Sequence, residues 1–219
     1  MATASEALRG YRSRRDFCVT PEPKGEKVAQ RKKNPIFVIQ KHAARQLHYD
    51  LRLEIDGVLV SWAVPKGPSL NPRHRRLAVR TENHPIEYAK FEGIIPEGEY
   101  GAGTVMVWDK GTYKNMSKHN GRVVSTATAL KHGEIKFFLK GKKLEGEFVL
   151  IRTDYGKKKG EEWLLMKMKD EYASARRNPV STQQKSALTD RTMTQIKREA
   201  CKKEPAVCRK APKKRARTR

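Results

Sequence analysis

Two apolar runs joined by an Asp-Gly dipeptide constrain the fold of this chain more than any other feature of its sequence. The run His48–Ile55 alternates between polar and apolar residues, and the run Val58–Val64 is apolar except for its serine. Asp56-Gly57 between them predicts a tight hairpin, because a type I′ turn needs positive φ at both central positions. The two runs are therefore expected to pair as antiparallel strands.

Further short runs of the same character follow along the chain, separated by Gly and Pro at short intervals. Long segments of 3.6-residue periodicity are absent, which argues against a helical fold. The other expected strands are 36–40, 76–81, 103–108, 132–139, 144–152 and 163–168. The pattern predicts an all-β domain over residues 35–172, a mostly antiparallel barrel or strongly curved sandwich.

The two ends of the chain differ from this middle in composition. Residues 1–34 hold few apolar side chains, among them Leu8 and Tyr11, and are expected to form an arm that docks on the barrel. Residues 173–219 carry a net charge of +12 and no aromatic residue. Such a segment buries too little apolar surface to offset its ordering entropy. We expect a basic, largely disordered tail there, with at most a short helix over 188–200.

The charge of the whole chain restricts its partners. With 48 Lys and Arg against 24 Asp and Glu, the formal net charge is +24. A surplus of this size favours a polyanionic partner, and nucleic acid is the commonest one. The tail would then hold phosphate backbones without reading sequence. For its polybasic tip at 213–219, a localisation signal is the rival interpretation.

Cysteine usage and hydropathy indicate the compartment. Cys18, Cys201 and Cys208 form an odd set without a Cys-x-x-Cys motif, so no disulfide framework is expected. No apolar run has the length of a signal peptide or of a membrane span. We therefore expect a cytoplasmic protein, associated with the nucleoid through its nucleic-acid partner, and no membrane contact.

The polar face of the first alternating strand carries the candidate chemistry. With a period of two, His48, Asp50 and Arg52 point to the same side. A His and a carboxylate about 7 Å apart, from a rise of ~3.3 Å per residue, can converge on one metal ion, and Arg is a fork-shaped donor for a phosphoryl group. His42 lies upstream beyond a bend and can return as a third ligand. Two His and one carboxylate leave positions open for water or substrate, which suits catalysis.

Two other interpretations of these residues stay open at this point. A His and an Asp on a strand are often solvated surface groups, in which case the chain is a non-catalytic nucleic-acid-binding barrel. Alternatively, His48-x-Asp50 with a distant His132 matches the ligands of a non-haem Fe(II) oxygenase. Against the oxygenase, no Arg follows His132 closely to hold a 2-oxo acid. The large basic charge would also be unexplained.

Two loops are relevant to an anionic site. His84 falls in a polar turn fixed by the following Pro85, and as a cation it can bind phosphate or protonate a leaving oxygen. The stretch 91–103 is rich in glycine but matches no phosphate-binding motif, and its acidic residues oppose phosphate. It is therefore interpreted as a structural turn leading into the next strand.

Long stretches of the chain resemble the 3′-phosphoesterase module of bacterial DNA ligase D and its stand-alone bacterial and archaeal relatives. The resemblance covers residues 9–172 and is carried by the stretches 42–54, 61–69, 84–103, 108–113, 146–152 and 163–167. It implies a β-barrel with the active site in a groove on one face. It also implies an enzyme dependent on Mn²⁺, with other divalent metals as alternatives, that heals DNA 3′ ends in non-homologous end joining of double-strand breaks. Such enzymes remove a terminal ribonucleoside to leave a 3′-phosphate, and then remove that phosphate to leave a 3′-OH.

The resemblance also implies roles for individual residues. His42, His48 and Asp50 match the metal ligands of the family, and Arg52 and His84 match its phosphate contacts. The other positions that match residues supporting activity are Tyr88, Gln40, Lys66, Arg15, Asp16 and Glu22. The implied partners are DNA 3′ ends on a primer-template, with or without a terminal ribonucleotide. A separate ligase, polymerase or Ku-like protein is also implied, since 219 residues have no room for the fused domains of ligase D.

Overall fold

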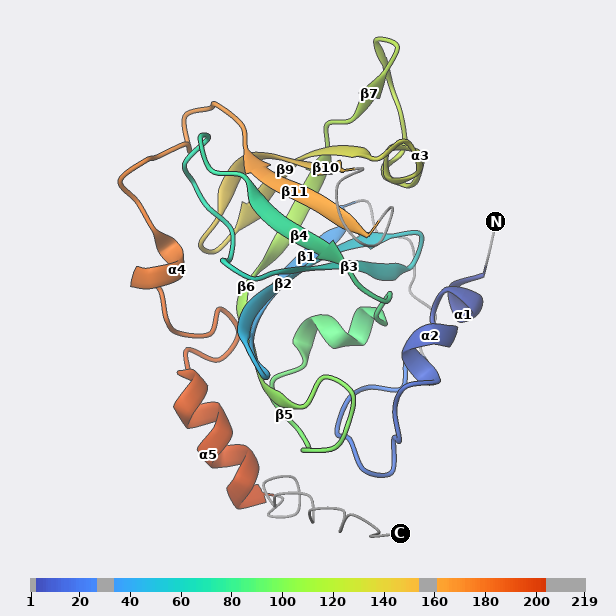
Figure 1. Cartoon of the computed structure of the whole chain (residues 1–219), viewed down its shortest axis with the longest axis vertical. Coiled ribbons are helices and arrows are strands. Elements are labelled where there is room, and N and C mark those ends of the chain that lie inside the picture. The colour runs from blue at the N-terminus through green and yellow to red at the C-terminus, as the bar shows by residue number, and fades with distance from the viewer. Residues whose placement is uncertain (1–2, 27–33, 154–160, 204–219) are drawn as a thin grey trace, which may run out of the picture.

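Eight strands close into an antiparallel barrel (Figure 1) in the computed structural model, which describes residues 3–26, 34–153 and 161–203. The strand order is β1-β2-β3-β4-β11-β10-β9-β6, and β6 pairs with β1 to complete the ring. The barrel strands are β1 Ile36–Ala43, β2 Leu47–Ile55, β3 Val58–Val64, β4 Arg76–Arg80, β6 Gly103–Asn115, β9 Glu134–Gly141, β10 Glu145–Arg152 and β11 Glu162–Lys167. The predicted all-β class is confirmed, and the architecture is the barrel.

Shorter elements surround the barrel. They are β5 Gly93–Ile95 beside β6, the hairpin of β7 Lys118–His119 and β8 Arg122–Val123, the 3₁₀ helix η1 Ile86–Lys90, and the helices α1 Ala4–Ala7, α2 Arg9–Arg12, α3 Thr126–His132, α4 Pro179–Thr182 and α5 Met193–Lys203. Most of these helices and strands are too short to be predicted from the periodicity of apolar residues in the sequence. Helix α3 occupies the start of the strand expected over 132–139, and it ends at Gly133, whose φ of 84° stops the helix before β9 begins.

The predicted hairpin between β2 and β3 is confirmed. Asp56 and Gly57 have φ angles of 48° and 82°, and Ile55 pairs with Val58 across the turn. Positive φ at two successive positions is the geometry that Asp-Gly adopts at small steric cost, so the local sequence determines the register of this strand pair.

The pairing of β1 with β2 places the polar face of the first strand. Gln40 lies opposite Asp50, and His42 lies opposite His48. The register between β1 and β6 shifts between Ile39 and Gln40, which is the signature of a β-bulge. Bulges bend a strand and redirect its side chains. This one lies immediately before the β1 residue that faces Asp50.

The N-terminal arm contributes to the core of the barrel. Tyr11 of α2 is fully buried, and Leu8 between the two short helices is 5% exposed. The Tyr11 hydroxyl donates to the carbonyl of Pro23 at 2.7 Å, so the end of the arm folds back over its start. Burial of such side chains, worth roughly 1.5–3 kcal/mol each, holds the arm against the barrel without long helices.

Residues 173–203 differ from the expected disorder. In Figure 1, α4 and α5 lie along the barrel on the side away from α1 and α2. Ile196 of α5 is 2% exposed, and the indole N–H of Trp108 donates to the carbonyl of Gln183 at 2.7 Å. The carboxylate of Glu92 accepts hydrogen bonds from Ser186, Thr189 and Arg191. The composition of residues 173–203 does not reveal these contacts with the barrel, because they are made by a backbone carbonyl and by one buried carboxylate, that of Glu92.

The short helix expected over 188–200 is present as α5, but it begins later. Asp190 has a φ of 58°, which breaks a helix. Thr192 then accepts from the backbone N–H of Gln195, whose side chain binds the Thr192 backbone in return. Residues 204–219, with the polybasic tip, lie outside the described residues, so the expectation for them stays a prediction.

Cysteines do not cross-link the barrel. Cys18 is an exposed free thiol, and Cys201 is disulfide-bonded. No cysteine of the sequence falls within a barrel strand. Across the described residues, none of the helices has the length and apolar character needed to span a membrane.

Candidate active site

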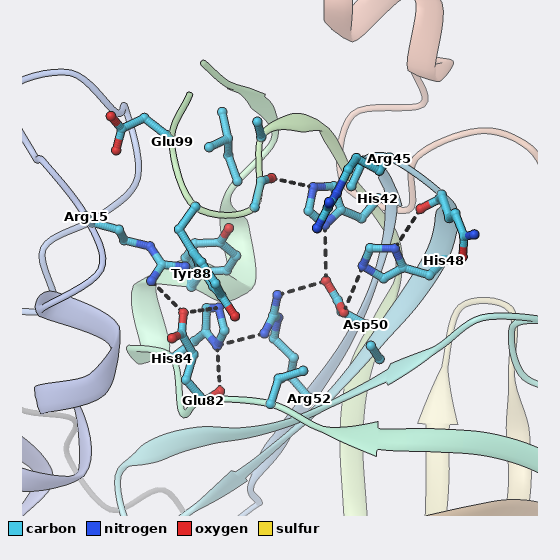
Figure 2. A pocket seen from close by; sticks show the side chains of 18 of the residues that line it. Arg15, His42, Arg45, His48, Asp50, Arg52, Glu82, His84, Tyr88 and Glu99 are labelled. Atoms are coloured by element: carbon cyan, nitrogen blue, oxygen red, sulfur yellow. Dashed lines mark hydrogen bonds and ion pairs between the residues drawn. The ribbon is translucent and has the colours of Figure 1, made fainter. Parts of the chain in front are cut away.

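A pocket of about 990 Å³ opens where β1 and β2 meet the N-terminal arm (Figure 2). Its walls come from the arm, the β1–β2 hairpin, the segment 81–88 and the loop between β5 and β6. Figure 2 shows two groups of side chains that meet at Asp50. We call His42, His48 and Asp50 the metal corner. The arginine corner consists of Arg52, His84, Tyr88, Arg15, Glu22 and Glu82.

The metal corner brings together the three ligands suggested by the strand pattern. His42 Nδ1 lies 3.6 Å from Asp50 Oδ2, and His48 Nε2 lies 3.4 Å from Asp50 Oδ1. One ligand atom from each residue lies within 4.8 Å of the others. Two imidazole nitrogens and one carboxylate oxygen form a donor set that suits a divalent first-row metal.

Backbone carbonyls fix both imidazole rings of the metal corner. His42 Nε2 lies 2.9 Å from the carbonyl oxygen of Gly101, and His48 Nδ1 lies 2.9 Å from that of Gln46. A carbonyl only accepts, so each of these nitrogens carries the ring proton. The opposite nitrogens, Nδ1 of His42 and Nε2 of His48, then face Asp50 and are the atoms available to a metal ion. Metal-binding histidines are commonly oriented in this way, so the residues present fit a metal ion.

Asp50 is ionised although it is buried. Burial opposes the charge, but Arg52 at 3.1 Å and the contacts with His42 and His48 hold the pKa of this carboxyl well below its usual value. Burial also opposes protonation of His48, yet the neighbouring Asp50 raises the pKa of that ring. The corner therefore has the negative charge that attracts a cation.

Arg52 is the centre of the arginine corner. Its side chain is 4% exposed. The guanidinium donates to Gln40 Oε1 at 2.8 Å, to Ser61 Oγ at 2.9 Å, to His84 Nδ1 at 2.8 Å and to Asp50 Oδ2 at 3.1 Å. A guanidinium has five N–H groups. These bonds fix its plane and leave one Nη2 N–H without a partner among the described residues.

His84 is neutral, which differs from the cationic ring considered from the sequence. Burial and the nearby charges of Arg52 and Arg15 lower the pKa of His84 well below its usual value. His84 Nδ1 lies 2.8 Å from Nη1 of Arg52, which can only donate, and 3.0 Å from the carbonyl oxygen of Glu82, which can only accept. His84 is therefore a neutral ring next to a fixed cation.

The arm completes the arginine corner through buried ion pairs. Arg15 donates to Glu22 at 2.9 Å and to Glu82 at 2.5 Å, and all three side chains are 7% exposed or less. Glu22 also accepts from the Tyr88 hydroxyl at 2.9 Å. The ring of Tyr88 lies 4.9 Å from the guanidinium of Arg52. Tyr88 thus positions Arg52 with its ring, while its hydroxyl is occupied by Glu22.

The remaining predicted residues lie at different depths. Gln40 is fully buried and holds Arg52, while its amide donates to the carbonyls of Tyr88 and Phe91 at 3.0 Å. Asp16 and Lys66 are exposed and do not line the pocket.

His132, the distant ligand of the oxygenase interpretation, lies elsewhere. Its ring is 4.2 Å from that of His119 in the hairpin of β7 and β8. His132 does not line the pocket. The structure therefore does not bring it to His48 and Asp50.

Three contributors to the pocket were not recognised in the sequence. Ser61 and Glu82 hold Arg52 and Arg15, and no local motif distinguishes them from ordinary polar residues. The stretch 91–103 does lead into a strand, as expected, but it also lines the pocket and supplies the carbonyl of Gly101. The available signal was its cluster of glutamates, Glu92, Glu97 and Glu99, in an otherwise basic chain.

Comparisons with known proteins point to one family. Residues 40–152 match the model of the DNA ligase D 3′-phosphoesterase domain. The chain is 44% identical over 193 residues to the multifunctional non-homologous end joining protein LigD of Pseudomonas aeruginosa, a match that covers 87% of this chain and 22% of the relative. It is 47% identical over 170 residues to the LigD protein of Mycolicibacterium smegmatis, covering 78% of this chain and 22% of the relative. The chain thus spans about a fifth of the length of these relatives.

Proposed function

Because this chain belongs to the DNA ligase D 3′-phosphoesterase domain family, we propose that it is a metal-dependent phosphoesterase that heals DNA 3′ ends. The observation that carries the proposal is Asp50, whose carboxylate contacts both imidazoles of the metal corner and Arg52 at 3.1 Å. One carboxylate therefore sets a metal site and a phosphate donor side by side, which is the arrangement that phosphoryl chemistry requires.

The proposed cofactor is Mn²⁺, held by His42, His48 and Asp50. A bound divalent metal polarises a phosphoryl oxygen and lowers the pKa of water. The two carbonyl-oriented imidazoles and the ionised carboxylate support this assignment. Other divalent metals with a similar affinity for nitrogen and oxygen ligands are alternatives.

The residues of the arginine corner bind and orient the phosphoryl group. Arg52 brings a fixed positive charge with one free N–H, and His84 brings a neutral imidazole beside it. Both side chains are held before substrate arrives, so little reorganisation is needed as charge develops on the phosphoryl oxygens. Their burial excludes water that would weaken these interactions.

The reaction consists of two hydrolyses. In the first, water adds to the phosphorus of the last phosphodiester and the bond to the 5′-oxygen of the terminal ribonucleoside breaks. The products are a free nucleoside and a strand with a 3′-phosphate. In the second, water adds to that phosphate and the bond to the 3′-oxygen breaks, which releases inorganic phosphate and leaves a 3′-OH. The family resemblance, rather than the pocket alone, supports the two-step order.

The proposed setting is repair of DNA breaks by non-homologous end joining. The relatives are named as multifunctional proteins of that process, and the net charge of +24 favours DNA as substrate. A polymerase, a ligase and a Ku-like protein are the proposed partners. A cytoplasmic, nucleoid-associated location follows from this substrate.

The decisive test uses the full chain, stripped of metal, with a primer carrying a 3′-phosphate. We expect no phosphate release until Mn²⁺ is added, and no release at any Mn²⁺ concentration from Asp50→Asn. A protein that binds the primer but releases no phosphate with any divalent metal is a binding module instead. Consumption of O₂ with Fe(II) in place of phosphate release would support the oxygenase.

A further inference from the structure

The rim of the pocket has an acidic side, which is unexpected in so basic a chain. Glu97 and Glu99 line the pocket in the loop between β5 and β6, and Asp16 is exposed nearby, its backbone N–H 3.5 Å from Glu99. The cations on this side are already paired, since Arg14 and Arg15 contact Glu82 at 3.1 and 2.5 Å. This side of the rim therefore repels a phosphate backbone.

Tyr100 presents an aromatic ring on the same side of the rim as these acidic residues. It lines the pocket and is 49% exposed, although most large apolar side chains of the described residues are buried. Its hydroxyl accepts from Arg14 at 2.9 Å, which ties the loop to the arm. Its neighbour Gly101 supplies the carbonyl that binds His42. The guanidinium groups of Arg14 and Arg15 lie 4.9 and 5.8 Å from the centre of the ring, so the ring is held at a fixed place on the rim.

The other side of the rim is basic. Arg45, in the turn between β1 and β2, is exposed and lines the pocket. It forms no ion pair with any residue in the described ranges. Figure 2 shows it beside His42, whereas Glu99 lies on the side of Arg15. Arg45 therefore lies on one side of the pocket, and the carboxylates of Glu97 and Glu99 lie on the other side with the ring of Tyr100.

We propose that this asymmetry sets the direction of the strand across the pocket. The anionic body of the strand passes over Arg45, and the nucleoside that leaves in the first hydrolysis rests its base on Tyr100. A nucleoside is neutral, so the acidic side accepts it but repels a leaving group that carries a further phosphate. The inference rests on the proposed function and adds to it a subsite for one neutral terminal nucleoside.

The first experiment compares two substrates of the full chain with Mn²⁺: a primer ending in one ribonucleoside, and the same primer ending in a 3′-phosphate. Only the first places a base on Tyr100. For Tyr100→Ala we expect kcat/KM on the diester to fall about tenfold to a hundredfold, the size of one base–aromatic stack. The fall on the monoester should be several times smaller. Tyr100→Phe, which keeps the ring, should restore most of the diester rate.

Removal of the base tests the same contact from the substrate side. A terminal abasic ribose should slow the wild-type protein as much as Tyr100→Ala slows it on the intact diester. Combining the two changes should add little, because they delete one interaction. Val123→Ala, an exposed apolar position in the separate hairpin of β7 and β8, is the matched control. We expect it to leave both rates unchanged.

The second experiment tests the direction of the strand. A diester whose leaving group is a dinucleotide should react slowly, and the double substitution Glu97→Gln, Glu99→Gln should raise its rate relative to the single-nucleoside diester. Arg45→Gln should raise KM on both the diester and the monoester. The inference is overturned if Tyr100→Ala lowers kcat/KM equally on the diester and the monoester. It is also overturned if the losses from Tyr100→Ala and from the abasic substrate add when the two changes are combined. An unchanged preference against the dinucleotide overturns it as well. A wild-type chain that is inactive on both substrates overturns the proposed function itself.

Discussion

The metal corner and the arginine corner share one carboxylate but are built in different ways. The three side chains of the metal corner come from one strand pair, and each imidazole is held by a single backbone carbonyl. The arginine corner draws on the arm, β2 and β3, η1 and the segment before it, and its side chains are linked in a buried network. The first corner is local and partly open, whereas the second depends on interactions between distant parts of the chain.

This difference indicates which residues of the pocket can be substituted without loss of stability. Either histidine of the metal corner can be replaced without disturbing many neighbours. A residue of the arginine corner cannot, because each replacement leaves a buried charge or donor without its partner, which costs more than the interaction itself contributes. We therefore expect substitutions in the two corners to separate metal binding from phosphate binding and from stability.

Asp50→Asn should have the largest effect, since Asp50 belongs to both corners. The change removes a charged ligand and the anionic partner of Arg52 together. We expect phosphate release to fall by at least about a thousandfold, more than loss of a single transition-state donor. Mn²⁺ binding followed by calorimetry should weaken in parallel. Mn²⁺-dependent turnover at the wild-type rate would contradict the assignment of both corners.

Arg52→Lys comes next and should separate the corners. Lysine keeps the charge, but it cannot serve four acceptors in a fixed plane. We expect a loss of about a hundredfold in turnover, with Mn²⁺ binding close to that of the wild type. His48→Ala is the matched comparison, because it should lose metal affinity first. If the lysine variant kept normal kinetics, the fork geometry of Arg52 would have no role.

The sequence could predict the metal corner because its residues follow strand periodicity. His48 and Asp50 are two residues apart on one strand face, and the short bend between β1 and β2 returns His42 to lie opposite His48. The arginine corner is different: Arg15 and Glu82 are 67 residues apart, and no local pattern connects them. The family resemblance pointed to Arg15 and Glu22, but not to Glu82 or Ser61. The same limit explains residues 173–203, whose anchors are carbonyls and one buried Glu92.

Arg15→Gln should have a smaller effect on activity and a larger one on stability. It leaves Glu22 and Glu82 buried without their cation, and breaking a buried ion pair on one side costs about 3–5 kcal/mol. We expect a lower urea midpoint and a reduced rate, since the arm then holds Tyr88 and His84 less firmly. The double variant Arg15→Gln, Glu82→Gln should recover part of the stability. A rate loss without any stability loss would place Arg15 on the substrate instead.

Removal of residues 204–219 should have the smallest effect on the chemistry, because both corners lie within the described residues upstream. The segment carries a net charge of +6 and should bind phosphates without reading sequence.

The position of the truncation matters, because a truncation after Tyr172 would also remove Ile196 and Gln183, which pack on the barrel. A chain that ends at Lys203 should bind DNA more weakly. The slope of log K against log salt should become shallower by roughly one unit for each phosphate that the shortened chain no longer neutralises. Its turnover on a saturating short primer should match that of the full chain. Identical salt slopes for the two chains would show that the basic end does not hold DNA, and a localisation signal would then be the better interpretation of its charge.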